Sequence, residues 1–392
     1  MSSGGVFGDL IGQEPVVAEL RRATAAAAAL LRGEPATGMT HAWLFTGPPG
    51  SGRSVAARAF AAALLCPDGG CGQCASCHQV RAGTHADLLP VRPDGLSYGV
   101  KQTRSLVLRA AGTPTGGRWR IVLFEDADRA TEQAANALLK AIEEPTPRTV
   151  WLLCAPSAEE LVTTIRSRCR LVVLRTPPSS AIAAVLTKEG AEPARALAAA
   201  RAAQGHVGRA RRLATDAEAA RRRDEVLAVP PRLTGLGQAL AAAAALVKSA
   251  EAEAAAITAE VDEPERSALR RAFGEGSTGK GVAKAVRGSA GAMRDLEDRQ
   301  KSRATRLKRD ALDRALLDLA AFYRDVLAVQ VGADVELASS GHERDVRRLA
   351  GSTPPEATVR RIEAIMACRA RLDVNVAPLL AVEELTLALT TG

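Results

Sequence analysis

The fold of this 392-residue chain is indicated by the string GPPGSGRS at residues 47–54. The string follows an apolar run at residues 42–46 (AWLFT) and precedes a helical pattern at residues 55–65. Glycines in such a turn let backbone N–H groups converge on phosphate oxygens, and the following helix adds partial positive charge. This context predicts a phosphate-binding P-loop. Its candidate nucleotide-binding residues are Gly47, Gly50, Ser51, Gly52, Arg53 and Ser54.

One position departs from the P-loop pattern, because Arg53 stands where lysine is expected. Lysine presents a compact point charge to the β and γ phosphates, whereas a planar guanidinium is bulkier and prefers bidentate geometry. Ser54 is the candidate Mg²⁺ ligand. We therefore expect weak binding of ATP or ADP and little or no hydrolysis.

A pair of acids, Glu125 and Asp126, follows the apolar run at residues 120–124. At this place a Walker B strand delivers an aspartate to magnesium and a glutamate to the attacking water. Here the order is reversed, so Glu125 is one methylene too long and Asp126 one too short for those tasks. The sequence thus predicts a degenerate ATPase site and leaves open whether the chain is itself an enzyme. For Asp128, a solvated strand end is the alternative interpretation.

Five short apolar runs alternate with helical patterns up to residue 176, which is typical of a parallel sheet covered on both faces. After the prolines at 177–178 the strand signals nearly vanish. We predict an α/β domain at residues 1–178, a small helical domain at 179–228 and a helical bundle at 229–392. The predicted strands are residues 42–46, 86–91, 120–124, 149–154 and 170–174.

Four of the seven cysteines fall within twelve residues, with the spacing C-x4-C-x2-C-x2-C. Such spacing lets the sulfurs reach one tetrahedral ion at about 2.3 Å, and four thiolates leave no open position for catalysis. The pattern predicts a structural Zn²⁺ site, with redox thiols as the alternative. Cys154 and Cys169 are expected to be buried packing residues. The predicted zinc ligands are Cys66, Cys71, Cys74 and Cys77.

A surface arginine, Arg168, lies in the string SRC immediately before the last predicted strand. An arginine at that edge can reach a neighbouring subunit and stabilise the charge that develops on its ATP. Taken alone, a surface arginine is more often simply solvated. Arg168 is therefore a candidate arginine finger only in combination with the other motifs.

The net charge of +8 permits contact with DNA phosphates without requiring it. No window approaches the roughly 20 apolar residues of a membrane span, and the first residues lack a signal-peptide pattern. We expect a cytoplasmic protein. A zinc-dependent nucleic-acid-binding module is one alternative, suggested by basic residues at 299–309. Because these alternate with acids and lack aromatic neighbours, a solvated bundle face is favoured.

In this order the motifs resemble the clamp-loader subunits of bacterial DNA polymerase III, which are AAA+ proteins. Two of the strings are especially characteristic, NALLK with EEP at 136–145 and SRC at 167–169. The other matching segments are residues 7–14 (FGDLIGQE), 41–54, the four cysteines at 66–77, and 375–380 (NVAPLL).

The resemblance implies a RecA-like AAA+ domain with a zinc module, a helical lid and a helical collar that forms a pentameric ring. In such a ring, with gamma/tau and delta subunits, Arg168 would act in trans on the adjacent ATP. The ring opens the sliding clamp and places it on primed DNA. Because Arg53 and the Glu125–Asp126 order depart from the hydrolysing pattern, the delta-prime branch of the family fits better. An ATP-hydrolysing gamma/tau-type subunit stays the alternative.

Overall fold

The computed structural model describes residues 5–93, 97–116, 118–273, 282–374 and 376–391. The chain divides into two compact units between Thr215 and Asp216. The N-terminal unit contains a parallel sheet and the helices up to α9, and the C-terminal unit is helical. An α/β domain followed by all-α structure is therefore confirmed. The finer division at residues 178 and 228 stays a prediction.

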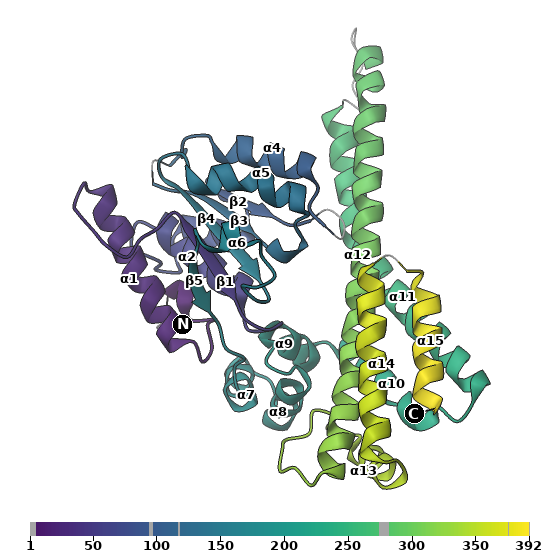
Figure 1. Cartoon of the computed structure of the whole chain (residues 1–392). Coiled ribbons are helices and arrows are strands. Elements are labelled where there is room, and N and C mark those ends of the chain that lie inside the picture. Colours follow the sequence, from purple (N-terminus) through teal and green to yellow (C-terminus); the bar gives the residue numbers. More distant parts are fainter. Residues whose placement is uncertain (1–4, 94–96, 117, 274–281, 375, 392) are drawn as a thin grey trace. The chain divides into compact units, whose positions relative to one another are not determined.

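A five-stranded parallel sheet forms the N-terminal unit, with the order β2-β3-β4-β1-β5. Helices α4 and α5 cover one face of the sheet and α2 lies against the other (Figure 1). All five predicted strands are present. The strands are β1 (Ala42–Thr46), β2 (Leu88–Val91), β3 (Arg120–Phe124), β4 (Thr149–Ala155) and β5 (Arg170–Val173). The helices around them are η1 (Gly5–Phe7), α1 (Glu14–Leu31), α2 (Arg53–Leu65), α3 (Ala75–Ala82), α4 (Val100–Ala110), η2 (Ala127–Arg129), α5 (Glu132–Glu143) and α6 (Thr163–Arg166).

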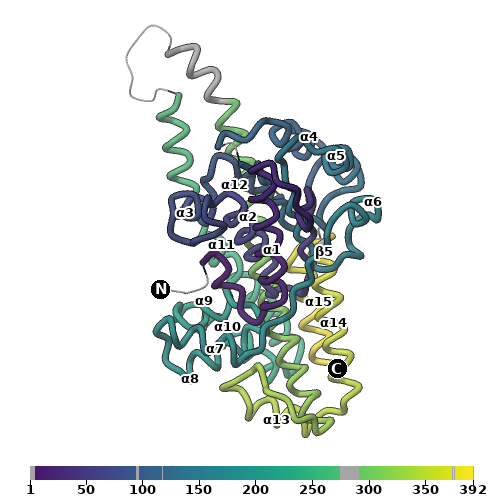
Figure 2. The backbone as a smooth tube through the Cα atoms, turned by 90° about the vertical axis from the view of Figure 1, so that its left-hand side faces the viewer, coloured from purple at the N-terminus to yellow at the C-terminus, as the bar shows by residue number. Residues whose placement is uncertain are grey.

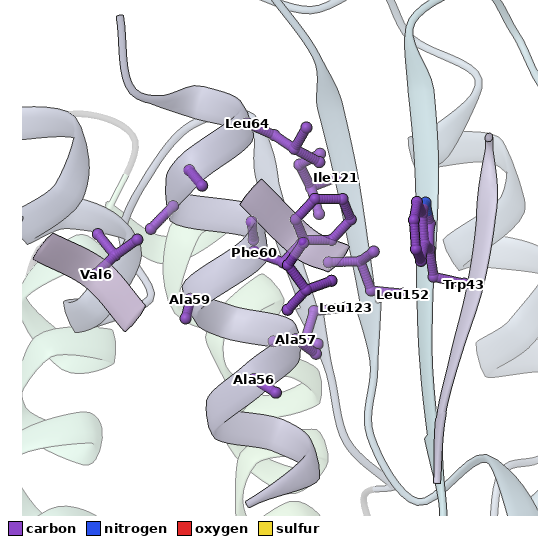
Figure 3. Packing of buried hydrophobic residues seen from close by; sticks show 14 of the residues in the cluster. Val6, Trp43, Ala56, Ala57, Ala59, Phe60, Leu64, Ile121, Leu123 and Leu152 are labelled. Atoms are coloured by element: carbon purple, nitrogen blue, oxygen red, sulfur yellow. The ribbon is translucent and has the colours of Figure 1, made fainter. Parts of the chain in front are cut away.

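The central strands β1, β3 and β4 are buried on both faces, which explains why they are continuous apolar runs. Successive side chains of β3 alternate between the faces: Ile121 packs with α2, and Val122 packs with α4 and α5. Figure 3 shows Phe60 of α2 pointing toward Ile121 and Leu152 of the sheet. This packing fixes α2, and with it the P-loop, against the carboxyl end of β1.

Three short helices complete the N-terminal unit after the prolines at 177–178, as the break in the sequence predicted. The backbone passes close to this connection at Gly205, where an added Cβ would lie 2.0 Å from Thr176 Cγ2. Only glycine fits there, so the turn before α9 is held against the end of the sheet domain. The helices are α7 (Ser179–Lys188), α8 (Pro193–Ala202) and α9 (Val207–Thr215).

The C-terminal unit is built on a long helical hairpin, in which α11 and α12 run side by side (Figures 1 and 2). A buried ion pair between Arg223 and Asp318, with N–O distance 3.1 Å, joins α10 to α12. Although α11 and α12 are long, no helix in the described ranges is apolar enough to cross a membrane. The elements are α10 (Ala217–Leu227), η3 (Pro230–Arg232), α11 (Leu236–Ala272), α12 (Val282–Gln330), α13 (Glu343–Ser352), α14 (Pro355–Asp373) and α15 (Pro378–Thr391).

Candidate nucleotide and metal sites

The predicted P-loop forms the turn between β1 and α2, with three glycines at positive φ. At Gly47 an added Cβ would lie 2.5 Å from the carbonyl oxygen of Leu174. At Gly50 it would lie 2.6 Å from Cβ of His206, which precedes α9. Gly47 and Gly50 are thus required by close packing as well as by φ, Gly52 is required by φ alone, and the loop has the backbone form of a phosphate cradle.

The side chains of this loop are directed at the protein itself. Arg53 Nη1 donates a hydrogen bond to the carbonyl oxygen of Gly47 at 2.7 Å. Burial raises the pKa of the Cys154 thiol, so this group near the loop stays protonated. Ser51 Oγ is buried and has no hydrogen-bond partner among the described residues. Arg53, the cation that departs from the P-loop pattern, is therefore hydrogen-bonded to the backbone of the loop itself.

The two strand-end acids lie directly after β3, as predicted, but they differ in their surroundings. Glu125 accepts from Arg58 Nη2 at 2.9 Å, and from Arg92 through Nε at 3.0 Å and Nη2 at 3.1 Å. Only 9% of its side chain is exposed. Asp126 has left-handed backbone geometry, with φ of 50°, which aspartate tolerates better than most residues. Both oxygens of Glu125 are thus occupied by guanidinium groups.

Two arginines and one histidine near the cradle were missed by the sequence analysis. Arg58 lies on α2 and Arg92 directly follows β2. A signal existed for Arg92, because the carboxyl ends of neighbouring parallel strands meet at one edge of a sheet. His206 had no such signal, since its packing against Gly50 depends on how the helices after the sheet fold back.

These residues do not fit a magnesium–nucleotide site. A magnesium ion takes oxygen ligands from a hydroxyl and carboxylates near the phosphates. Here the Glu125 carboxylate is held by two arginines, Arg58 and Arg92. Asp128 is half-buried, and burial raises the pKa of its carboxyl. Arg53 is thus bonded to the loop backbone, and Glu125 is paired with Arg58 and Arg92.

The four clustered cysteines, in contrast, form a set with the geometry of a metal site. Their four sulfur atoms all lie within 4.8 Å of one another. Cys66 Sγ lies 3.7 Å from that of Cys71 and 3.6 Å from that of Cys74. A tetrahedron with metal–sulfur distances of about 2.3 Å has sulfur–sulfur edges of about 3.8 Å. The thiols are therefore spaced as zinc ligands are.

Local backbone prepares this site. Cys66 ends α2 and Cys74 caps the start of α3, accepting from the Cys77 N–H at 3.4 Å. The backbone N–H groups of Gln73 and Cys74 lower the pKa of Cys71 to about 7, whereas burial raises the pKa of Cys77. Bound zinc would tie α2, α3 and the intervening loop together. In the same region Val6 N donates to the Gly70 carbonyl at 3.0 Å, which attaches the N-terminal segment to the module.

The remaining cysteines lie apart from this cluster. Cys154 and Cys368 are buried, and Cys169 packs against the apolar core beneath α4 and α5. Burial raises the pKa of Cys169 to about 12, so its thiol stays protonated near neutral pH. These surroundings are those of packing residues.

Arg168 follows α6 and its side chain is 40% exposed. Its Nη2 forms an ion pair with Glu143 Oε1 at 2.8 Å. Its Nη1 donates to the carbonyl oxygen of Thr164 at 2.8 Å. Two of the characteristic strings, the one ending in EEP and the SRC string, therefore meet at this ion pair.

Other segments that carried the resemblance also have defined roles. Gln13 is buried, and its side-chain amide forms two hydrogen bonds with the backbone of Arg175, which ties the N-terminal segment to the end of the sheet domain. Residues 378–380 begin α15 of the C-terminal unit. Asn375 lies outside the described residues.

Comparison with known proteins agrees with these features. Residues 24–178 match the profile of the family described as DNA polymerase III, delta subunit. The resemblance to the delta-prime type is thereby confirmed over the sheet domain. The chain is 40% identical over 135 residues to the DNA polymerase III subunit delta' of Pseudomonas aeruginosa, covering 33% of this chain and 41% of that protein.

Two further relatives show how far the similarity extends. The subunit delta' of Bacillus subtilis is 34% identical over 158 residues, or 40% of this chain and 48% of its own length. The subunit gamma/tau of Mycobacterium bovis is 33% identical over 187 residues, or 46% of this chain and 31% of its own length. The chain thus spans less than half the length of each of these curated relatives.

Proposed function

We propose that this chain is a delta-prime-type subunit of the bacterial DNA polymerase III clamp loader. In this proposal it works in the cytoplasm, in a pentameric ring with gamma/tau and delta subunits, and hydrolyses little or no ATP itself. It supplies Arg168 in trans to a neighbour's ATP while the ring places the sliding clamp on primed DNA. Zinc, bound by the four clustered cysteines, would serve as a structural ion.

One observation carries the non-hydrolysing part of the proposal. Glu125, the acid nearest to a Walker B position, accepts from Arg58 and Arg92 and is nearly buried. A carboxylate that is neutralised in this way cannot also polarise a water molecule. The hydrogen bond from Arg53 to the Gly47 carbonyl supports the same conclusion for the P-loop.

The alternative is an ATP-hydrolysing subunit of the gamma/tau type. It is favoured by the longer alignment with gamma/tau proteins, 187 residues against 135 for the Pseudomonas delta'. Steady-state ATP turnover of the isolated chain separates the two proposals. We expect the ATP turnover of the unmodified chain to equal the background turnover of a matched Arg53→Ala variant. Turnover well above that background would support the gamma/tau type.

Arg168→Ala in a reconstituted loader tests the arginine finger. We expect a loss of ATP turnover of about 10³-fold at the neighbouring site, because arginine fingers contribute about that factor or more. The ring should still assemble, since Arg168 is exposed and its contacts are local. Arg104→Ala, on the exposed side of α4, is a matched control. Unchanged turnover in the Arg168→Ala ring would remove the proposed role.

A further inference from the structure

Helix α5 ends in an acidic residue, Glu143, and Glu144 follows it. The carboxyl end of a helix carries partial negative charge, so a carboxylate in the last turn is electrostatically unfavourable. A cation close to Glu143 would offset this unfavourable interaction. In the described part of the chain, Glu143 forms an ion pair with Arg168.

The ion pair engages most of the Arg168 guanidinium. Nη2 lies 2.8 Å from Glu143 Oε1, while Nη1 donates to the Thr164 carbonyl and, at 3.1 Å, to Ser167 Oγ. A guanidinium binds phosphate best through two parallel N–H groups. In this position both terminal nitrogens already have partners. Arg168 must leave at least the carboxylate before it binds an outside phosphate.

The residues on both sides of Arg168 hold the backbone in place. Cys169 packs into the core beneath α4 and α5. Arg170 forms an ion pair with Glu19 at 2.7 Å, and its guanidinium lies 5.0 Å from the centre of the Trp43 ring. The freedom to move is therefore confined to the Arg168 side chain, whose ion pair is about 40% exposed at both ends.

We propose that Glu143 is a positioning residue that holds Arg168 in a resting place on this chain. The phosphates of the neighbouring subunit's ATP then displace the Glu143 carboxylate and take over the guanidinium. This inference rests on the proposed function of Arg168. An exposed ion pair is weak enough for a multiply charged phosphate to replace it. Glu143 thus competes with ATP and keeps the finger withdrawn when the neighbouring site is empty.

The test uses the reconstituted loader with Glu143→Gln, compared with Glu144→Gln as the matched control. Removing the competing charge should raise kcat/KM for ATP about two- to fivefold at low salt, the range expected for an exposed ion pair. At saturating ATP the gain should shrink, because the phosphates then displace Glu143 fully. The gain should also shrink between about 0.05 M and about 0.5 M salt, since the ion pair is screened in the unmodified ring as well.

The outcomes distinguish a failure of the proposed Glu143 contact from a failure of the proposed function of Arg168. If Arg168→Ala leaves turnover unchanged, both fail together. If Arg168→Ala abolishes turnover while Glu143→Gln behaves like Glu144→Gln, only the resting contact fails. A fall in kcat/KM for Glu143→Gln also overturns it, because Glu143 would then orient the finger for use. Glu143→Ala with an unchanged melting temperature excludes misfolding as the cause.

Discussion

The zinc module and the P-loop lie at opposite ends of the same helix, α2, yet they treat their functional groups in opposite ways. At the carboxyl end, four thiols face one point and are spaced for a shared ion. At the amino end, Arg53 bonds to its own loop, and Glu125 beside the helix is held by Arg58 and Arg92. The side chains at the carboxyl end of α2 are placed to bind an ion, whereas Arg53 and Glu125 at the amino end are bonded within the protein.

This difference shows that a motif is judged by what its side chains are bonded to as well as by its spacing. Two of the P-loop glycines, Gly47 and Gly50, are needed for close packing against Leu174 and His206. Their presence therefore says little about nucleotide. The four cysteines also pack with the apolar core around α2, but the mutual spacing of their sulfur atoms is that of zinc ligands.

Loss of one zinc ligand should have the largest effect of any change discussed here. We expect Cys71→Ser to lower the zinc content from about one ion per chain to near zero. The free energy of unfolding should fall by roughly 5 kcal/mol, less than the 10 kcal/mol or more of isolated zinc peptides, because the sheet core persists. Metal analysis by mass spectrometry and thermal unfolding measure the two effects.

The matched control is Cys169→Ser, which changes a half-buried thiol outside the cluster. It should keep its zinc. If Cys71→Ser also kept its metal and its stability, the contrast between the two ends of α2 would disappear, and the cluster would have to be treated as redox thiols.

Much of the fold was predictable because its signals are local. Each predicted strand is an apolar run, and the structure begins and ends it within about two residues: β2 begins at Leu88 where residue 86 was expected. The prolines at 177–178 likewise marked the start of α7. The place of α10 was not predictable from such signals, because its buried side chains pack against α12, about 90 residues later.

The candidate sites were predictable only in part, for the same reason. The order of strands, which puts the end of β2 beside the end of β3, determines that Arg92 reaches Glu125. The sequence places both residues at strand ends and therefore at one edge of the sheet, but it does not show that β2 and β3 are neighbours. Cysteines spaced two to four residues apart must lie close together in any fold, so their cluster could be foreseen.

An intermediate effect is expected at Glu125. Glu125→Gln removes the charge that Arg58 and Arg92 share, which should lower the free energy of unfolding by about 1–3 kcal/mol. This lies below the usual cost of breaking a buried ion pair, since 57% of the Arg92 side chain is exposed. Chemical denaturation measures it, with the exposed Glu144→Gln as control. If Glu125→Gln were as stable as Glu144→Gln, the Glu125 carboxylate would not be held by the arginines. It would then be available to a nucleotide site at the amino end of α2.

The smallest effect is expected at Asp128, and it depends on pH. Burial raises the pKa of this carboxyl, and its Oδ1 has no hydrogen-bond partner in the part of the chain that the structure describes. A carboxyl whose pKa is raised by folding stabilises the fold at low pH, and that contribution is lost as pH rises through the raised value. Asp128→Asn should therefore be more stable than the unmodified chain near pH 7, by less than about 1 kcal/mol because water screens the half-exposed group. The gain should vanish toward about pH 4, where carboxyls in the unfolded chain become protonated.

Thermal unfolding across this pH range, with exposed Asp68→Asn as control, measures the Asp128 difference. Repeating it with magnesium and ATP extends the comparison to the cradle. A cation held beside Asp128 would stabilise its charged form, so the sign of the substitution would reverse if the amino end of α2 bound magnesium nucleotide. We expect the sign to stay the same, because Arg53 and Glu125 are already engaged within the protein.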